Sequence, residues 1–396
     1  MLSLYNETVP FKVHIELTDQ CNARCPQCPR NIILPKSKNL REHPNLKNSW
    51  ITYDQFVKIF SGHESNINQI LFSGNFGDPV FNPDFEKILK HTIDNLIHKK
   101  RKIVPKEYTS RRTGVLRGHA KTCTNGGFRK PEWWAKLAKD TIPHTEFYDN
   151  VMCFAIDGLE DTHHLYRVNT RFDRVIENAK AWIGAGGKAE WQFIRFEHNK
   201  HQEQTARELS KELGFALFQV VDSSRGSIQE FNFKGENYFL KMPEKSKEFK
   251  KRQAIHFENK GLDIDHTEEQ PSMNVPVVHR GSANPKDPDE EINCIEANMN
   301  RIYIDCEGFI YPCCWIGTHQ YHMRNQTRSL FDKGDVLFNK TYDEKDKAWN
   351  RPFVDILHDA WFEYILPESW DTAPCTICTQ NCGKKEIRTK REMTVL

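Results

Sequence analysis

The sequence predicts an α/β fold in which six strands and their helices form a partial (β/α)6 TIM-like barrel, followed by a cysteine-rich C-terminal extension. Two observations lead to this prediction. Short apolar runs alternate with longer amphipathic stretches from residue 12 to about residue 221. The 12 cysteines also gather toward the two ends of the chain, three at 21–28 and seven beyond residue 293. Structural cysteines scattered through a core would not avoid the middle of the chain in this way.

Each predicted strand is a short run rich in apolar and β-branched residues. The six strands are KVHIEL (12–17), QILFS (69–73), AKTCTN (120–125), VMCFAID (151–157), AEWQFIRF (189–196) and FALFQVV (215–221). The helix-like stretches between them include DFEKILKHTIDNLI (84–97), PEWWAKLAK (131–139), FDRVIENAKAWIGAG (172–186) and QEQTARELSKELG (202–214). Gly214 fits a helix C-cap before the last strand. In folds of this class the chemistry gathers at the carboxyl ends of the strands.

Three regions follow from these patterns. Residues 1–223 form the predicted barrel. Residues 224–292 are rich in Lys, Glu, Asp, Asn and Pro, which favours an irregular connection with at most one short helix. Residues 293–396 form the extension, where NRIYIDCEGFIYPCCWIG predicts a hairpin that turns at Glu307–Gly308.

The composition of the chain bears on which kinds of binding partner to expect. The formal net charge is only +2 over 396 residues, which gives no global reason to expect a nucleic-acid or membrane partner. No apolar run approaches the ~20 residues of a membrane span, and the N-terminus lacks the pattern of a signal peptide. We therefore expect a cytoplasmic protein, in which cysteines serve as metal ligands or buried packing residues rather than disulfides.

The stretch TDQCNARCPQCPRN follows the first predicted strand and places Cys21, Cys25 and Cys28 on one loop. Thiolates at these spacings can each reach a different iron of a cubane cluster. Three ligands would leave the fourth iron open for a substrate or cofactor. The alternative is a zinc site that takes its fourth ligand from elsewhere in the chain.

CNARCPQC resembles the cluster loop of the radical S-adenosylmethionine (radical SAM) superfamily. The resemblance implies that Cys21, Cys25 and Cys28 are the catalytic residues and hold a [4Fe–4S] cluster whose open iron binds the amino and carboxylate groups of SAM. An electron from the reduced cluster would then break the sulfonium bond, and the resulting 5′-deoxyadenosyl radical would abstract hydrogen from a substrate. It also implies a reductant such as flavodoxin or ferredoxin.

Other strand ends carry patterns that resemble this family. The turn GDP after the second strand resembles the family's Gly-Gly-Glu-Pro element, with an aspartate in place of the usual glutamate. TNGG (124–127) ends the third strand, and an aspartate and an arginine follow the fourth, the arginine expected in the next helix. A guanidinium suits the SAM carboxylate because the pair can form two parallel hydrogen bonds. The SAM-binding residues so implied are Gly77, Asp78, Asn125, Asp157 and Arg167.

The C-terminal cysteines resemble the SPASM/twitch extensions of radical SAM enzymes. Thirteen residues separate Cys294 from Gly308, and four more precede Cys313, which fits their C-x(9–15)-G-x4-C signature. The closing PCTICTQNC is shorter than the full seven-cysteine pattern, so one auxiliary [4Fe–4S] cluster is expected rather than two. A zinc ribbon is the main alternative. The preferred ligands are Cys294, Cys313, Cys375 and Cys378, with Cys382 as a competitor and Cys306 or Cys314 as substitutes.

The family includes enzymes that modify peptides and proteins and one that cyclises GTP. We expect a radical SAM enzyme that acts on a peptide, protein or small molecule. A leader-dependent peptide maturase is less favoured, because the first strand starts by residue 12 and no peptide-recognition domain precedes it. Cys123 and Cys153 fall within strands and are expected to be packing residues.

The stretch 98–121 holds nine Lys or Arg residues against one Glu. A solvated surface insertion is the favoured interpretation. The alternative is an arm that binds the phosphates of a nucleotide or nucleic acid, and the basic tail GKKEIRTKRE has the same two interpretations. Modification of a nucleotide or nucleic-acid base is therefore the second enzyme hypothesis. A non-catalytic zinc or iron–sulfur protein is the remaining alternative.

Overall fold

The computed structural model describes residues 4–7, 9–97, 118–142, 148–223, 228–243, 254–256, 292, 294–324, 342–372 and 376–382. Its centre is a nine-stranded sheet with the order β11-β8-β7-β6-β5-β4-β1-β12-β13. Six of its parallel strands follow one another as predicted, which confirms the partial barrel. They are β1 (Phe11–Ile15), β4 (Ile67–Phe72), β5 (Gly118–Thr124), β6 (Tyr148–Ala155), β7 (Lys188–Arg195) and β8 (Leu217–Asp222).

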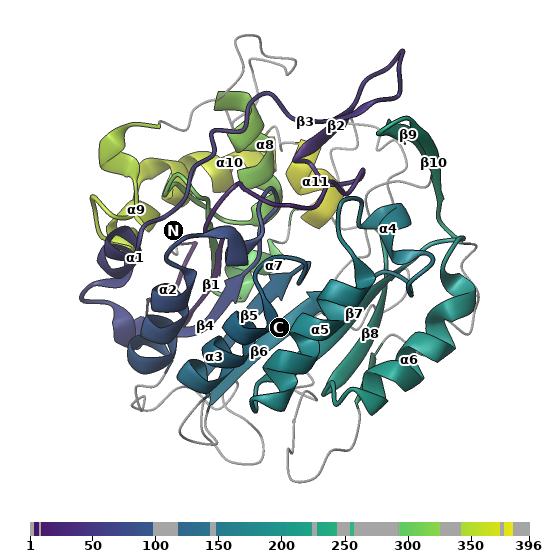
Figure 1. Ribbon diagram of the computed structural model, residues 1–396. Helices are drawn as coiled ribbons and strands as arrows, with labels where there is room; N and C mark the ends of the chain where they lie inside the picture. The colour runs from purple at the N-terminus through teal and green to yellow at the C-terminus, as the bar shows by residue number, and fades with distance from the viewer. Residues whose placement is uncertain are drawn as a thin grey trace.

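Helices cover the outer face of this sheet, and Figure 1 shows α5 and α6 lying along β7 and β8. The α-helices of the barrel are α1 (Tyr53–Phe60), α2 (Phe85–His91), α3 (Pro131–Thr141), α4 (His163–Tyr166), α5 (Phe172–Gly184) and α6 (Glu203–Glu212). A π-helical turn, η3 (Thr92–Leu96), continues α2, and the 3-10 turns are η1 (Glu64–Asn66), η2 (Pro79–Phe81) and η5 (Lys200–Gln202). Gly214 follows α6 with φ +84°, as predicted for a C-cap.

The C-terminal extension continues the barrel sheet. Strand β12 (Arg301–Ile304) pairs in parallel with β1, and β13 (Ile310–Tyr311) returns antiparallel to it. Gly308 has φ +86° in the turn between them, which confirms the predicted hairpin. The helical elements α7 (Ile295–Asn298), α8 (Cys314–Arg324), η8 (Glu344–Asp346), α9 (Phe353–Leu357), η9 (Trp361–Ile365), α10 (Leu366–Thr372) and α11 (Thr376–Cys382) complete it. In Figure 1 the green and yellow helices α8, α9 and α10 lie together. The three-domain division stays a prediction.

Part of the segment 224–292 is more regular than its composition predicted. Strands β9 (Ile228–Phe233) and β10 (Glu236–Lys241) form a hairpin, and β11 (Ala254–His256) pairs antiparallel with β8. Lys234 and Gly235 make the turn with φ +54° and +86°, the two positive values that a tight type I′ hairpin turn requires. Polar residues separate the apolar ones in β9, and charged residues lie at both ends of β10, so both strands are polar on average.

A second hairpin was also not predicted. It consists of β2 (Asn31–Ile33) and β3 (Leu40–Glu42), directly after the cysteine loop. Figure 1 shows it near the β9–β10 hairpin, and Asn39 forms an isolated bridge with Asn232.

Most of the basic stretch lies outside the described residues, which omit 98–117, and so does the basic tail after residue 382. Lys121, the last residue of that stretch, lies in β5, where its buried side chain forms an ion pair with Glu190 at 2.5 Å. The prediction of a solvated surface was therefore wrong for Lys121, because β5 begins at Gly118. Among the residues that the structure describes, no helix combines the length and apolar character needed to cross a membrane.

Candidate functional site

The loop after β1 brings Cys21, Cys25 and Cys28 into one partly apolar environment. Cys25 is buried and the other two thiols are half-buried. The loop is held in shape by two contacts: the backbone N–H of Cys28 donates to the Cys25 carbonyl at 3.0 Å, and Asn31 Nδ2 donates to the same oxygen at 2.9 Å. The apolar side chains around it are Ala23, Leu40, Tyr166, Val168, Phe196, Phe231 and Leu240.

Polar groups from other strand ends reach these sulfurs. Asn125 Nδ2 lies 3.4 Å from Cys21 Sγ, and Arg167 Nη1 lies 3.6 Å from Cys25 Sγ. Burial raises the pKa of Cys21 well above its ordinary value and that of Cys25 to about 11, although the Arg167 cation opposes the rise at Cys25. Thiols in this environment ionise when a metal takes the place of their protons, so the donor set fits an iron–sulfur cluster.

Asp78 joins the turn after β4 to the turn after β5. Its buried carboxylate accepts hydrogen bonds from the backbone N–H of Asn125 at 2.8 Å and from Asn125 Nδ2 at 2.7 Å. Thr124 Oγ1 lies 3.0 Å from both carboxylate oxygens. Burial raises the pKa of Asp78, and the hydrogen bonds from Asn125 and Val80 oppose that rise. Two residues predicted to bind SAM thus lie in contact beside Cys21.

Gly77 fits where a side chain would not. A Cβ at this position would lie 1.8 Å from the carbonyl oxygen of Thr18. The backbone N–H groups of Phe76 and Gly77 donate to Glu16 Oε1 at 2.6 and 2.9 Å, and the Tyr303 hydroxyl donates to Glu16 Oε2 at 2.5 Å. Burial raises the pKa of Glu16 to about 7. Glu16 thus orders the loop that carries Asp78, and its only signal in the sequence is an acidic residue inside an apolar strand.

Asp157 and Arg167 form a buried ion pair. Arg167 Nε lies 2.5 Å from Asp157 Oδ2, and the Asp157 side chain is fully buried. Burial raises the pKa of Asp157, and the Arg167 cation opposes this. Arg167 caps the end of α4 instead of lying inside a helix as predicted, because the chain leaves helical geometry there and reaches φ +69° at Asn169.

Two further residues that the sequence analysis missed hold this site together. Asn199 donates from Nδ2 to the carbonyl oxygens of Asp157 and Ile194 at 3.2 and 2.9 Å. Arg30, two residues after Cys28, is buried and pairs with Glu42 at 3.0 Å. Nothing in the sequence signals Asn199, whereas Arg30 is part of the CPRN string.

In the described parts of the chain, no three His, Cys, Asp or Glu side chains meet at a point that one metal ion could fill. A cubane cluster does not need such a point, since each thiolate binds its own iron.

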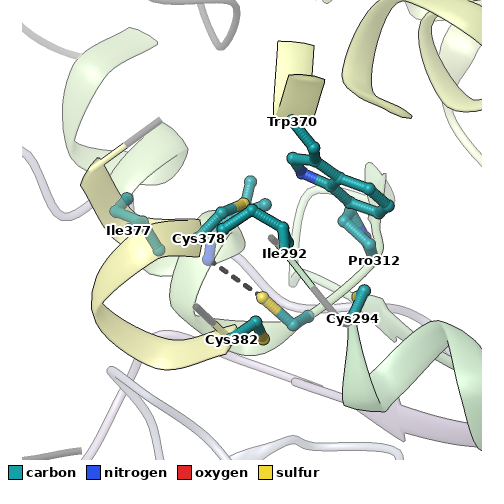
Figure 2. Close-up of a pocket in the computed structure, with 9 residues that line it drawn as sticks. Ile292, Cys294, Pro312, Trp370, Ile377, Cys378 and Cys382 are labelled. Atoms are coloured by element: carbon teal, nitrogen blue, oxygen red, sulfur yellow. Dashed lines mark hydrogen bonds between the residues drawn. The ribbon is translucent and has the colours of Figure 1, made fainter. Parts of the chain in front are cut away.

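Four C-terminal thiols line one small cavity, and Figure 2 labels three of them, Cys294, Cys378 and Cys382. Cys294 precedes α7 and Cys313 precedes α8, while Cys378 and Cys382 lie four residues apart and therefore on one face of α11. The other lining residues are Ile292, Pro312, Ile316, Trp370 and Ile377.

The remaining C-terminal cysteines differ in position. Cys306 is buried in a separate cluster with Phe76 and Tyr321. Cys314 begins α8 without lining the cavity, and its carbonyl accepts a hydrogen bond from Asn75 Nδ2 at 3.3 Å. Cys375 lies outside the described residues.

Two of the cavity thiols have raised pKa values, and a buried indole N–H also lies at the cavity. The hydrogen bond between Cys294 and Cys382, together with burial, raises the pKa of Cys294, and burial raises that of Cys313. Ile316 N–H donates to Cys313 Sγ at 3.5 Å, drawn as the dashed line in Figure 2. Trp370 Nε1 is buried and has no hydrogen-bond partner within the described structure. A donor in this position fits a group that presents sulfur acceptors.

Neither a protein-family model nor a curated protein matches this sequence. A solved structure does: Streptococcus suis SuiB bound to S-adenosylmethionine is 15% identical, with 92% of this chain and 68% of SuiB covered at a TM-score of 0.50. The chain shares the fold of SuiB. This finding confirms the fold class that the alternation of strands and helices predicted.

Two other solved structures match with lower similarity. One is anSMEcpe with bound AdoMet and Cp18Cys peptide, 12% identical over 94% of this chain and 89% of that chain, with a TM-score of 0.44. The other is BtrN in complex with AdoMet and 2-DOIA, 12% identical over 98% of both chains, with a TM-score of 0.37. At these TM-scores they carry no argument about this chain.

Proposed function

We propose that the chain is a radical SAM enzyme that abstracts hydrogen from a peptide, protein or small-molecule substrate. The observation that carries the proposal is the sulfur environment: three thiols on one loop, with an amide and a guanidinium from other strand ends beside two of them. When bound by Cys21, Cys25 and Cys28, a reduced [4Fe–4S] cluster supplies the electron that cleaves SAM and yields the 5′-deoxyadenosyl radical.

The surrounding residues of the chain would orient SAM and exclude water. Arg167 uses Nε for Asp157, so its other nitrogens, of which Nη1 faces Cys25, are the ones that would pair with the SAM carboxylate. Asp78 and Asn125 would fix the amino group, because both lie beside Cys21 and hold each other in place. Tyr166 and Phe196, whose rings pack 4.6 Å apart, would shield the reactive centre from water.

The proposal is tested on anaerobically reconstituted protein by counting iron and sulfide, then adding dithionite and SAM and assaying 5′-deoxyadenosine. About eight irons per chain with 5′-deoxyadenosine formed supports radical chemistry and a second cluster. About four irons with cleavage supports the first cluster alone. Absence of both iron and SAM cleavage would favour a zinc site in the loop after β1. Absorption near ~400 nm also distinguishes the two kinds of site, because an iron–sulfur cluster absorbs there and zinc is colourless.

We further propose that Cys294, Cys313, Cys378 and Cys382 hold the auxiliary [4Fe–4S] cluster. Four thiols in one apolar cavity provide a full ligand set, and the Trp370 N–H is a donor in need of an acceptor. This assignment takes Cys382 as the fourth ligand, where the sequence alone favoured Cys375. The nucleic-acid alternative depends mainly on residues 98–117 and on the basic tail after residue 382, both outside the described structure.

Substitution of Cys382 by Ala is expected to lower the iron content from about eight to about four per chain, because the auxiliary cluster would lose one of the four thiolates proposed to hold it. Cys306→Ala removes a buried thiol outside the cavity and is the matched control, expected to keep about eight. Iron analysis with EPR of the reduced protein measures both. Full iron content in Cys382→Ala would contradict its role and favour Cys375.

Replacement of Trp370 by Phe is expected to move the midpoint potential of the auxiliary cluster to a more negative value. An N–H donor stabilises the extra negative charge of the reduced cluster, and Phe keeps the ring packing while removing the donor. Trp361, buried in η9, does not line the cavity, so Trp361→Phe serves as the control and should leave the potential unchanged. An EPR-monitored redox titration measures the shift, and equal potentials in the Trp370 variant and the wild type would refute it.

A further inference from the structure

A pair of thiols within the barrel strands belongs to neither cysteine set. Cys123 of β5 and Cys153 of β6 are direct partners in the parallel register of these strands. Neighbouring strands lie about 4.8 Å apart. This spacing falls within the range of about 4.4–6.8 Å between Cα atoms that a disulfide can bridge.

Both thiols lie on the inner face of the barrel. Side chains alternate along a strand, and Ala120, Met152 and Phe154 belong to the main apolar core on the helix-covered side. Cys123 and Cys153 therefore point to the other side.

Lys121 shares the inner face with Cys123 because the two lie two residues apart on β5. Its ammonium lies 2.5 Å from the carboxylate of Glu190 on β7, and both side chains are buried. A buried ion pair therefore lies beside the thiol pair.

The two thiols are not equivalent. Cys123 is half-buried, whereas Cys153 is only 1% exposed. A hydrogen bond from Cys153, helped by the Lys121 cation and by Ser73, lowers the pKa of Cys123, although burial and the Glu190 carboxylate oppose this. The same hydrogen bond, together with burial, raises the pKa of Cys153. A more accessible thiol with a lowered pKa next to a buried thiol is an arrangement that suits thiol–disulfide exchange.

We propose that Cys123 and Cys153 form a redox-active dithiol that reacts with small disulfide compounds. The Cys123 thiolate attacks one sulfur of the disulfide, its S–S bond breaks, and one thiolate leaves. The Cys153 sulfur, giving its proton to that leaving thiolate, then attacks Cys123 Sγ. A Cys123–Cys153 disulfide forms and a second thiolate leaves, which takes a proton from solvent. The protein loses two electrons, and the small disulfide gains them as two thiols.

The position of this dithiol connects it to the SAM site. Cys123 lies two residues before Asn125, which contacts Cys21 Sγ at 3.4 Å and Asp78 at 2.7 Å. A disulfide would tie β5 to β6 directly beside the turn that carries Asn125. The dithiol chemistry itself depends on neither cluster nor SAM, so its test is independent of the proposed radical reaction.

The test treats reconstituted protein anaerobically with bis(2-hydroxyethyl) disulfide and maps peptides without reduction. Wild type is expected to give a Cys123–Cys153 linked peptide with the loss of two hydrogens. Cys153→Ser should instead retain a hydroxyethylthio adduct on Cys123, and Cys123→Ser should acquire adduct on Cys153 at least about tenfold more slowly. Circular dichroism confirms that each variant is folded.

Several outcomes would overturn the proposal, and the first two need no variant. These are wild type that gives no linked peptide, and wild type in which Cys153 takes up the adduct before Cys123. Comparable adduct rates on Cys123 in Cys153→Ser and on Cys153 in Cys123→Ser would also overturn it, because the two thiols would then be equivalent.

Discussion

Replacing Cys25 with Ala is expected to lower 5′-deoxyadenosine formation by at least about a thousandfold, to the background of the assay. Cys25 is the most buried thiol of its loop at 6% exposure, and its sulfur lies nearest the Arg167 cation. Loss of this ligand would leave two thiolates for three irons, so the electron needed for SAM cleavage has no stable source. The measurement is 5′-deoxyadenosine by chromatography after addition of dithionite and SAM.

Two controls separate this effect from general damage. Cys306→Ala makes the same change in a buried thiol outside both proposed cluster sites, and its cleavage activity should match the wild type. In Cys25→Ala, iron should fall by about four per chain while the auxiliary cluster remains visible by EPR. Sustained 5′-deoxyadenosine formation by Cys25→Ala would contradict the assignment of the loop after β1.

The barrel could be predicted because its signals are local. Each parallel strand is buried on the helix-covered face and reads as a short apolar run, and each helix has its own amphipathic period. The cysteine loop could be predicted for the same reason, since Cys21, Cys25 and Cys28 lie within eight residues. The order of the strands then brought Asn125, Asp157 and Arg167 to the same end of the sheet.

Contacts between distant segments could not be predicted in this way. The Tyr303 hydroxyl reaches Glu16 across 287 positions of sequence, and this depends on β12 pairing with β1. The choice of Cys382 as a cavity residue depends on where α11 begins, because only a helix brings positions 378 and 382 to one face. The pairing of Cys123 with Cys153 depends on strand register, and a slip by one residue would separate them.

Replacing Arg167 with Met is expected to lower the free energy of unfolding of the apoprotein by about 3–5 kcal/mol, the range for breaking a buried ion pair by removing one partner. The Asp157 carboxylate is fully buried, and Arg167 is its ion-pair partner. The double variant Asp157→Asn with Arg167→Met should lose less than the sum of the two single changes, because it buries no unpaired charge. Urea titrations of anaerobic, reduced protein measure each value.

The pH dependence distinguishes a buried charge from lost packing. Burial raises the pKa of Asp157, and in Arg167→Met no cation opposes that rise. A carboxyl whose folded-state pKa lies above its unfolded-state pKa binds its proton more tightly in the folded protein. The folded state therefore loses stability as the pH rises from the unfolded-state pKa through the folded-state pKa. The difference in the free energy of unfolding between wild type and Arg167→Met should therefore shrink as the pH falls from 7 toward 5. If this difference in stability stays constant with pH, Arg167 stabilises the fold through packing and not through its charge. The orientation of Arg167 toward Cys25 would then not depend on Asp157.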